Sequence, residues 1–276
     1  CLTSRKARAG LQSVRTVIVD EIHALVRDKR GAHMALSLER LDSLCRAAGS
    51  PPPTRVGLSA TQRPIEEVAR FLVGADRVDE GGVPQCHILD GGHRRALDLR
   101  VLLPKDELGA VCSSAQWEDV HEQMAALIEA HKTTLIFVST RRLCERTAHS
   151  LAGRLGEEAV VAHHGSMSRR LRHSVEERLQ QGQLKAVVAT ASLELGIDIG
   201  AVDLVCQIGS PRAISTFLQR VGRANHRPAP DAVPRARLFA LTINELVECA
   251  ALVRAAQSGL LDRQEGPHEP LDVLRS

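Results

Sequence analysis

The sequence predicts an α/β fold in which one arrangement, a parallel sheet covered by helices, is used twice in tandem. Short apolar runs rich in β-branched residues alternate with helical patterns along nearly the whole chain of 276 residues, which is typical of parallel sheets. A stretch rich in Gly, Asp and Pro at about 74–92 interrupts this alternation and marks a candidate linker. The length fits one or two domains.

The first half contains two predicted strands, each followed by a helical pattern. An apolar run at 14–19 predicts the first strand, and a helix with one apolar stripe follows it from about 31 to 48. Gly49 and the prolines after it end this helix. A second strand is predicted at 54–58, and Pro64 opens the next helix at a position that tolerates proline.

The second half repeats the alternation over more elements. Its predicted strands lie near 97–103 and at 134–138, 159–162, 186–189, 204–208 and 237–241. Its predicted helices lie near 117–131, 141–155, 168–181, 214–223 and 244–256.

The charge balance identifies no class of partner, because 36 basic residues face 33 acidic ones and the formal net charge is only +3. Most basic residues are arginine, which suits bidentate contacts with phosphate. Aromatic residues are scarce, with four Phe, one Trp and no Tyr. Binding of a nucleic acid would therefore rest on contacts with backbone phosphates more than on stacked bases.

The seven cysteines are scattered without any C-x-x-C pair, which argues against a disulfide framework and against a zinc site. This pattern fits a reducing cytoplasm, and no apolar stretch reaches membrane-spanning length. We therefore expect a cytoplasmic protein without a membrane partner. Because the sequence begins with Cys rather than Met and ends abruptly, we expect it to be a piece of a longer chain.

Asp20 and Glu21 stand at the carboxyl end of the first predicted strand, where open α/β sheets place their ligands. Asp20 can hold Mg²⁺ directly or through water, since hard cations prefer oxygen ligands. Glu21 can orient or deprotonate a water beside a nucleotide γ-phosphate. The alternative is a solvated turn that happens to be acidic.

Ser59, Ala60 and Thr61 end the second strand. Their two hydroxyls could bond to the neighbouring acidic pair and respond to the bound nucleotide, although an ordinary strand-to-helix turn has the same composition.

Ser139, Thr140 and Arg141 follow the strand at 134–138 and open the next helix. Amide groups at a helix N-terminus favour anions, and Ser and Thr are also good N-caps. Both interpretations can hold together.

His163, His164 and Gly165 follow the strand at 159–162, with His173 nearby. We reject a metal site, because adjacent histidines point in divergent directions and no carboxylate or cysteine completes a ligand set. A polar turn that touches a nucleic-acid backbone fits better.

Two further segments carry candidate residues. The turn at 190–200 contains Thr190, Gly196 and Asp198 after a strand. The segment 219–227 places three arginines on about two helical turns, and an arginine that reaches a γ-phosphate stabilises transition-state charge in phosphoryl transfer. A solvated basic face is the alternative.

Together these segments resemble the motor core of superfamily-two helicases. Residues 20–23 resemble its motif II, 59–61 motif III, 137–141 motif IV, 190–198 motif V and 219–227 motif VI. Residues 30–41, 192–200 and 207–212 narrow the resemblance to the large helicase-related (Lhr) family, which the chain resembles from about 2 to 262.

The resemblance implies two RecA-like domains that face each other across a cleft holding ATP and Mg²⁺. Residues 1–84 would form the C-terminal half of the first domain, which we expect to be truncated at its N-terminus. Residues 85–96 would be a linker, 97–262 the second domain, and 263–276 the start of a following domain. The phosphate loop G-x-x-x-x-G-K-[ST] is absent from these residues, and we expect it upstream.

The resemblance also implies roles for single residues. Asp20 would support the metal and Glu21 would activate water, while Arg223 stabilises charge with help from Arg220 or Arg227. The ATP site would further include His23, Gly196, Asp198 and Gln219. Ser59 and Thr61 would couple hydrolysis to closure. The phosphates of the strand would be held by Ser139, Thr140, Arg141, His163, His164, Gly165 and Thr190.

Two positions depart from the related patterns. Asn225 stands where the family usually has Gly, and Asn tolerates a left-handed backbone well. His226 stands where many superfamily-two members have a further arginine, so Arg223 is the preferred arginine finger.

The implied activity is an ATP-dependent helicase that moves 3′ to 5′ on single-stranded DNA, unwinds DNA and RNA–DNA duplexes, and serves DNA repair. One alternative is a non-catalytic nucleic-acid-binding scaffold derived from a helicase. Another is an RNA-directed DExH helicase.

Overall fold

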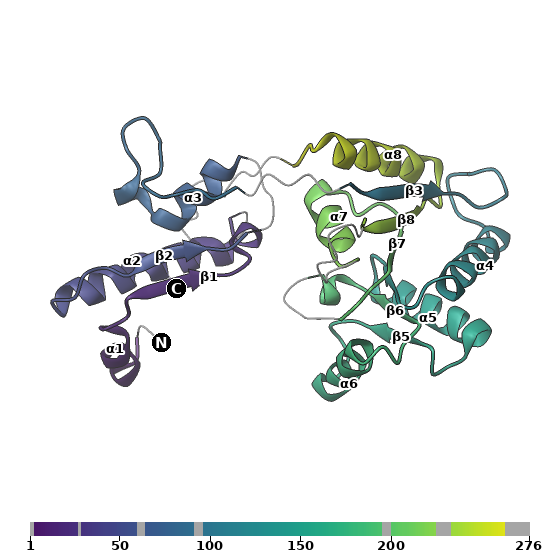
Figure 1. Ribbon diagram of the computed structural model, residues 1–276, viewed down its shortest axis with the longest axis horizontal. Helices are drawn as coiled ribbons and strands as arrows, with labels where there is room; N and C mark the ends of the chain where they lie inside the picture. The colour runs from purple at the N-terminus through teal and green to yellow at the C-terminus, as the bar shows by residue number, and fades with distance from the viewer. Residues whose placement is uncertain are drawn as a thin grey trace. The chain divides into compact units, whose positions relative to one another are not determined.

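A computed structural model describes residues 3–26, 29–59, 64–90, 96–194, 200–224 and 233–262. The chain divides into two compact units, Cys1–Gly92 with Asp262–Ser276 and His93–Leu261 (Figure 1). No helix within the described ranges combines the length and apolar character needed to cross a membrane.

The first unit contains a parallel pair of strands, β1 (Thr16–Val19) and β2 (Thr54–Gly57), with Ile18 opposite Val56. One face of the pair packs on helices, and the buried core there is Val19, Ile22, Val26, Leu38, Val68 and Leu72. The described helices of this unit are α1 (Arg5–Leu11), α2 (Lys29–Ala47), α3 (Ile65–Val73) and the short 3₁₀ segments η1 (Ile22–Ala24) and η2 (Ala75–Arg77).

A buried arginine joins β2 to the two main helices of this unit. The Arg55 guanidinium lies 2.9 Å from Oδ2 of Asp42 and 3.0 Å from Oε1 of Glu39, both on α2. It also donates to the carbonyls of Leu72 and Val73 at the end of α3, each at 3.1 Å. Paired charges of this kind are costly to break, because either partner alone would be left buried without compensation.

The second unit contains a six-stranded sheet in the order β3-β8-β7-β4-β6-β5, in which every neighbouring pair is parallel. Its strands are β3 (Asp98–Leu102), β4 (Thr134–Phe137), β5 (Val160–His163), β6 (Ala186–Ala189), β7 (Leu204–Ile208) and β8 (Arg235–Phe239). Its helices are α4 (Ser114–Glu129), α5 (Arg141–Leu155), α6 (Arg169–Gln180), α7 (Ile214–Val221), α8 (Ile243–Ser258) and the short η3 (Ala191–Leu193).

Helices cover both faces of this sheet. Alternate residues of β4 enter different cores, with Leu135 and Phe137 in one and Ile136 in the other. The first core contains residues of α6, α7 and α8, and the second contains residues of α4 and α5. All residues of β4, β6 and β7 are buried, as expected for parallel strands covered on both sides.

The only tryptophan of the sequence, Trp117, lies on α4 in this second unit. The guanidinium carbon of Arg146 on α5 lies 4.4 Å from its ring centroid, and the His121 ring lies at 5.5 Å. The Arg146 contact joins α5 to α4, whereas His121 lies on α4 itself.

The predicted fold class is confirmed: parallel strands covered by helices occur in both units. The predicted strands and main helices are present, with end points shifted by a few residues. Helix α1 was not predicted, and β8 begins at Arg235 rather than 237. The stretch at 74–92 contains η2 and an isolated bridge between Val78 and Pro84, so part of it is folded onto the first unit.

Candidate functional site

The acidic pair lies in a tight turn at the carboxyl end of β1. Asp20 follows the strand directly, and its Oδ1 accepts a hydrogen bond from the Glu21 amide at 2.9 Å. Glu21 has a left-handed backbone, with φ 49° and ψ 37°. Among the described residues, Arg212 is the one other non-glycine residue with positive φ. Such strain costs about 1 kcal/mol or more and clusters at functional sites.

Neighbouring backbone fixes this turn. The Leu58 amide donates to the Val19 carbonyl at 2.9 Å, and the Ile22 amide donates to the Leu58 carbonyl at 3.0 Å. In α2, a Cβ atom at Gly31 would lie 1.8 Å from the carbonyl oxygen of Leu25. Glycine is therefore required at position 31 for α2 to begin this close to the acidic turn.

His23 connects Ser59 to Glu21. Its ring is almost fully buried, with Nδ1 3.2 Å from Oγ of Ser59 and Nε2 3.5 Å from Oε2 of Glu21. Burial lowers the pKa of His23, although the carboxylates of Glu21 and Asp20 oppose that shift. Ser59 thus reaches Glu21 through His23. Thr61 lies outside the described residues.

The donor set at this turn fits a magnesium ion. Asp20 is exposed and offers carboxylate oxygen, the ligand that Mg²⁺ prefers. Within the described ranges, no three or more His, Cys, Asp or Glu side chains gather around a possible metal position. Mg²⁺ usually keeps several waters and binds through one or two carboxylates, so a carboxylate such as that of Asp20 suits it.

In the second unit, Glu145 connects the ends of β4 and β5. Thr140 caps α5, because its Oγ1 accepts a hydrogen bond from the Leu143 amide. Arg141 and His164 both reach Oε1 of Glu145, at 3.0 and 3.2 Å. The predicted residues that follow β4 and β5 are therefore connected along one edge of the second unit. The exposed Ser139 and Gly165 lie beside them.

His163 holds the turn after β6 against the end of β5. Its ring is buried, with Nδ1 2.8 Å from Oγ of Ser192 and Nε2 3.2 Å from Oε1 of Glu176. Its carbonyl accepts hydrogen bonds from the Thr190 amide and from the Ser192 hydroxyl. Burial lowers the pKa of His163. Because both ring nitrogens have partners within the unit, the ring itself positions this edge.

Arg220 and Arg223 differ sharply although they lie only three residues apart. Arg220 is buried, donates to Oε1 of Gln207 at 2.7 Å and to Oε2 of Glu194 at 3.0 Å, and stacks on the Phe137 ring. Arg223 is partly buried and donates from Nε and Nη2 to the carbonyl of Glu194 at 3.1 and 2.6 Å.

Glu194 binds both arginines, although it is not among the residues predicted from sequence. Its one visible signal was a charged residue between Leu193 and Leu195 in an otherwise apolar run. Gln219 lies half-buried on α7. The predicted positions Gly196, Asp198, Asn225, His226 and Arg227 lie outside the described residues.

Two family models match this chain. The model described as DEAD/DEAH box helicase matches residues 2–69, and the model described as helicase conserved C-terminal domain matches residues 117–227. The first range contains the acidic turn and Ser59, and the second contains the edge residues and both arginines.

Curated relatives match the chain over nearly its whole length. It is 42% identical to the ATP-dependent helicase Lhr-Core of Methanothermobacter thermautotrophicus, over 99% of the chain and 31% of that protein. It is 41% identical to the Lhr helicase/probable uracil glycosylase of Mycolicibacterium smegmatis, over 97% of the chain and 19% of that protein. The chain thus spans about a third of the length of the first relative and less of the second.

Solved structures agree with these matches. The helicase Lhr of Mycobacterium smegmatis, bound to single-stranded DNA and AMP-PNP, has a TM-score of 0.87 at 45% identity, over 99% of this chain and 34% of that one. Dbp5 of S. cerevisiae, bound to RNA and ADP BeF3, shares the tandem RecA-like fold with a TM-score of 0.61 at 19% identity, over 96% of this chain and 62% of that one. From its motifs, fold and relatives, the chain belongs to the Lhr family of superfamily-two DEAD/DEAH-box helicases.

Proposed function

We propose that this chain is part of an ATP-dependent helicase that moves along single-stranded DNA and hydrolyses ATP as it moves. The observation that carries the proposal is the Ser59–His23–Glu21 connection at the carboxyl end of the strands of the first unit. A strained acidic turn suits a site that hydrolyses a nucleotide, and the hydroxyl connected to it could couple hydrolysis to a change in the protein. The relatives named ATP-dependent helicase support it.

At this site, Asp20 would bind Mg²⁺ and Glu21 would orient and deprotonate the attacking water. The ion, when bound, neutralises negative charge on the nucleotide phosphates. Burial lowers the pKa of His23, and its ring would keep the Glu21 carboxylate in place. Backbone hydrogen bonds to Leu58 fix the turn that carries Asp20 and Glu21. Both carboxylates are therefore already in position, and β1 does not need to move.

Arg223 would stabilise the charge that develops on the transferring phosphoryl group. In the second unit it donates to the backbone carbonyl of Glu194. Arg220 is buried with Glu194, and we assign it a positioning role. Gln219, Gly196, Asp198 and Arg227 stay candidates for the nucleotide site.

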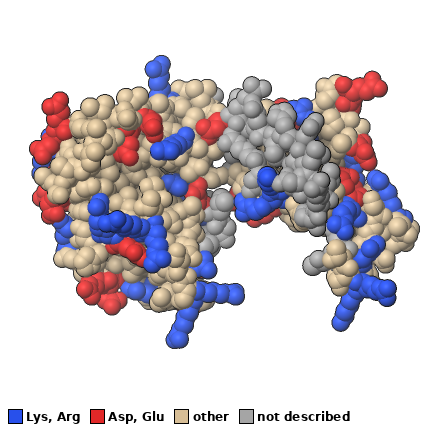
Figure 2. All heavy atoms as spheres, turned by 180° about the vertical axis from the view of Figure 1, so that it is seen from behind, with Lys and Arg blue, Asp and Glu red and all other residues tan. Residues whose placement is uncertain are grey.

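The edge of the second unit would hold the phosphates of the DNA strand. The candidates for contact with phosphate are Ser139, Thr140, Arg141, His164, Gly165 and Thr190, and His163 would position this edge through its buried ring. Figure 2 shows basic side chains interspersed with acidic ones over the face in view. Ser59 and Thr61 would couple hydrolysis to movement. The proposal further includes movement in the 3′ to 5′ direction and unwinding of DNA and RNA–DNA duplexes. The protein would act in the cytoplasm and serve DNA repair.

The test is ATP turnover by the complete protein with and without single-stranded DNA, combined with displacement of a labelled strand from a partial duplex. Wild type should hydrolyse ATP faster when DNA is present, and Glu21→Gln should abolish this turnover while ATP still binds. Unchanged turnover in Glu21→Gln would refute the role of Glu21. DNA binding without any ATP hydrolysis would identify a scaffold, and activity confined to RNA would identify an RNA-directed helicase.

A further inference from the structure

The first turn of α6 carries an unusual concentration of positive charge. Arg169, Arg170, Arg172 and His173 occupy four of its first five positions, and no acidic residue lies in the first turn. A helix N-terminus already bears partial positive charge and normally favours acidic residues. Helices α3 and α8 of this chain follow that rule, with Glu66, Glu67 and Glu245 in their first turns. Helices α1, α2, α4, α5 and α7 also lack an acidic residue in the first turn. Helix α6 differs in carrying three arginines within its first four positions, an arrangement that a bound anion would stabilise.

Acidic residues nearby do not neutralise these arginines. Glu176 on the same helix pairs with His163 at 3.2 Å and with His173 at 3.9 Å, and Glu177 pairs with His173 at 3.2 Å. Within the described part of the chain, none of the three arginines has a carboxylate within 4.0 Å. The Nε atom of Arg172 is moreover buried without a hydrogen-bond partner. A buried donor of this kind costs about 1–3 kcal/mol until an acceptor reaches it.

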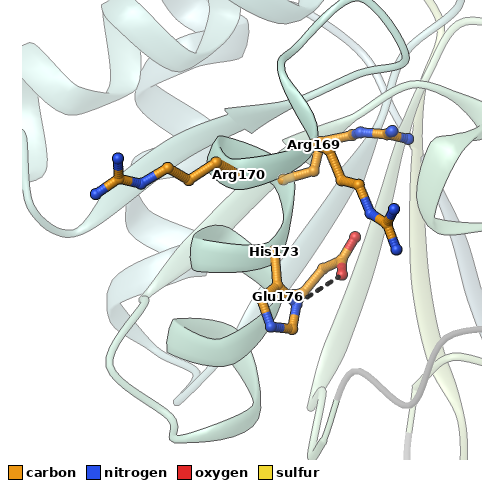
Figure 3. A pocket seen from close by; sticks show the side chains of 5 residues that line it. Arg169, Arg170, His173 and Glu176 are labelled. Carbon is orange, nitrogen blue, oxygen red and sulfur yellow. Dashed lines mark ion pairs between the residues drawn. The ribbon is translucent and has the colours of Figure 1, made fainter.

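These residues line a pocket of about 620 Å³ on the surface of the second unit. Arg169, Arg172, His173 and Glu176 recur at i, i+3, i+4 and i+7 and therefore share one face of α6. In Figure 3 the Arg170 side chain extends to one side, away from His173 and Glu176. Arg169 and Arg172 are thus the pair best placed to act together.

The pocket adjoins the edge already proposed to hold the DNA strand. Helix α6 begins only four residues after Gly165, and Glu176 at the pocket binds the ring of His163. Arginine forks match phosphate geometry, whereas reading of bases calls for stacking side chains that this chain largely lacks.

We propose that Arg169 and Arg172 of α6 form a phosphate-binding subsite for the single-stranded nucleic acid, an extension of the edge at His164 and Arg141. This inference rests on the proposed function and adds residues that the motifs do not include. The subsite contacts backbone phosphate without reading sequence. It increases the affinity for DNA and leaves the ATP site unchanged.

The test measures binding of a fluorescein-labelled oligo-dT by anisotropy over a range of salt concentrations. Each lost phosphate contact on a single strand lowers the slope of log K against log[salt] by about 0.7. Arg169→Gln/Arg172→Gln should therefore lower the slope by about 1.4 and weaken binding by roughly tenfold or more. Arg169→Lys/Arg172→Lys should retain most of the affinity, and Arg254→Gln on α8 should bind as wild type does.

Thermal stability separates this role from a structural one. Removing unpaired positive charge from the positive end of α6 should leave the melting temperature unchanged or raise it slightly, whereas a structural role would lower it. ATP turnover without DNA should equal that of wild type. The inference is overturned if wild type and Arg169→Gln/Arg172→Gln bind the oligonucleotide equally tightly and with the same salt slope. That result is expected if these arginines bind an acidic protein instead. Failure of wild type to bind would instead contradict the proposed function.

Discussion

Arg223 donates two hydrogen bonds to the backbone carbonyl of Glu194, from Nε at 3.1 Å and from Nη2 at 2.6 Å. The side chain of the same Glu194 binds Arg220. One residue of the turn after β6 therefore holds two arginines by different groups. The buried Arg220 binds the carboxylate of Glu194, and the partly buried Arg223 binds its backbone carbonyl.

Arg223→Ala in the complete protein should lower DNA-stimulated ATP turnover by about 10³- to 10⁵-fold, the range typical of an arginine finger. ATP binding should change little, since the lost contact forms in the transition state. Steady-state kcat and nucleotide affinity measure the two effects. Arg178→Ala is a matched control, because Arg178 also donates to a backbone carbonyl, that of Glu158. A loss smaller than about tenfold would move the finger to another residue.

Ser59→Ala should uncouple hydrolysis from movement. The variant removes the hydroxyl that contacts His23 and leaves both carboxylates intact, so ATP turnover should stay within about twofold of wild type. Strand displacement should fall by roughly tenfold, a usual size for coupling between two sites. Parallel ATPase and unwinding assays give the ratio. Ser43→Ala removes another hydrogen-bonded serine, from α2, and should change neither activity; equal losses of both activities in Ser59→Ala would contradict coupling.

Glu194→Gln should destabilise the second unit by about 3 kcal/mol or more, because it leaves the buried Arg220 guanidinium without its counter-charge. Arg220→Met should be destabilising for the reciprocal reason. The double variant should lose less than the sum of the two, with a coupling energy above about 1 kcal/mol. Urea denaturation of the four proteins measures this cycle. Additive losses would show that the two side chains contribute independently.

The second unit should lose stability as the pH falls from 6.5 towards 4. Burial lowers the pKa of His121 to about 4, and the charges of Arg154 and Arg146 add to that effect. The unfolded chain binds a proton near pH 6.5 while the folded state stays neutral, so this contribution is complete above pH 6.5 and is lost on acidification. His121 alone accounts for up to roughly 3 kcal/mol.

His121→Phe should flatten the pH dependence of the free energy of unfolding over this range, measured by circular dichroism in urea. His149→Phe serves as the control, because His149 is an exposed residue of α5. If the free energy of unfolding of His121→Phe depends on pH as steeply as that of wild type, other groups cause the acid sensitivity.

The central strands of the second unit, β4, β6 and β7, were predictable from sequence because their burial leaves continuous apolar runs. The run at 186–189 is buried at every position and has one plausible structure. Helix α1 gave no such signal, since none of its residues is buried. Its sequence carries no apolar stripe, and periodicity is the signal that sequence-based prediction uses.

At the site, the sequence identified the strand ends but not the contacts between them. Arg220 and Arg223 have the same side chain but different surroundings. The difference comes from contacts with Glu194, Gln207 and Phe137, which lie on three other parts of the second unit. The connection of Ser59 to Glu21 through His23 likewise depends on the parallel register of β1 and β2. Such contacts come from tertiary packing, which local patterns do not encode.

Trp117 has a further practical consequence. Because the one indole of the chain lies between α4 and α5 of the second unit, its fluorescence emission reports unfolding of that unit and is insensitive to local melting of the first. Far-ultraviolet ellipticity records the helices of both. Comparison of the two signals during denaturation would therefore reveal whether the units unfold together, without any introduced label.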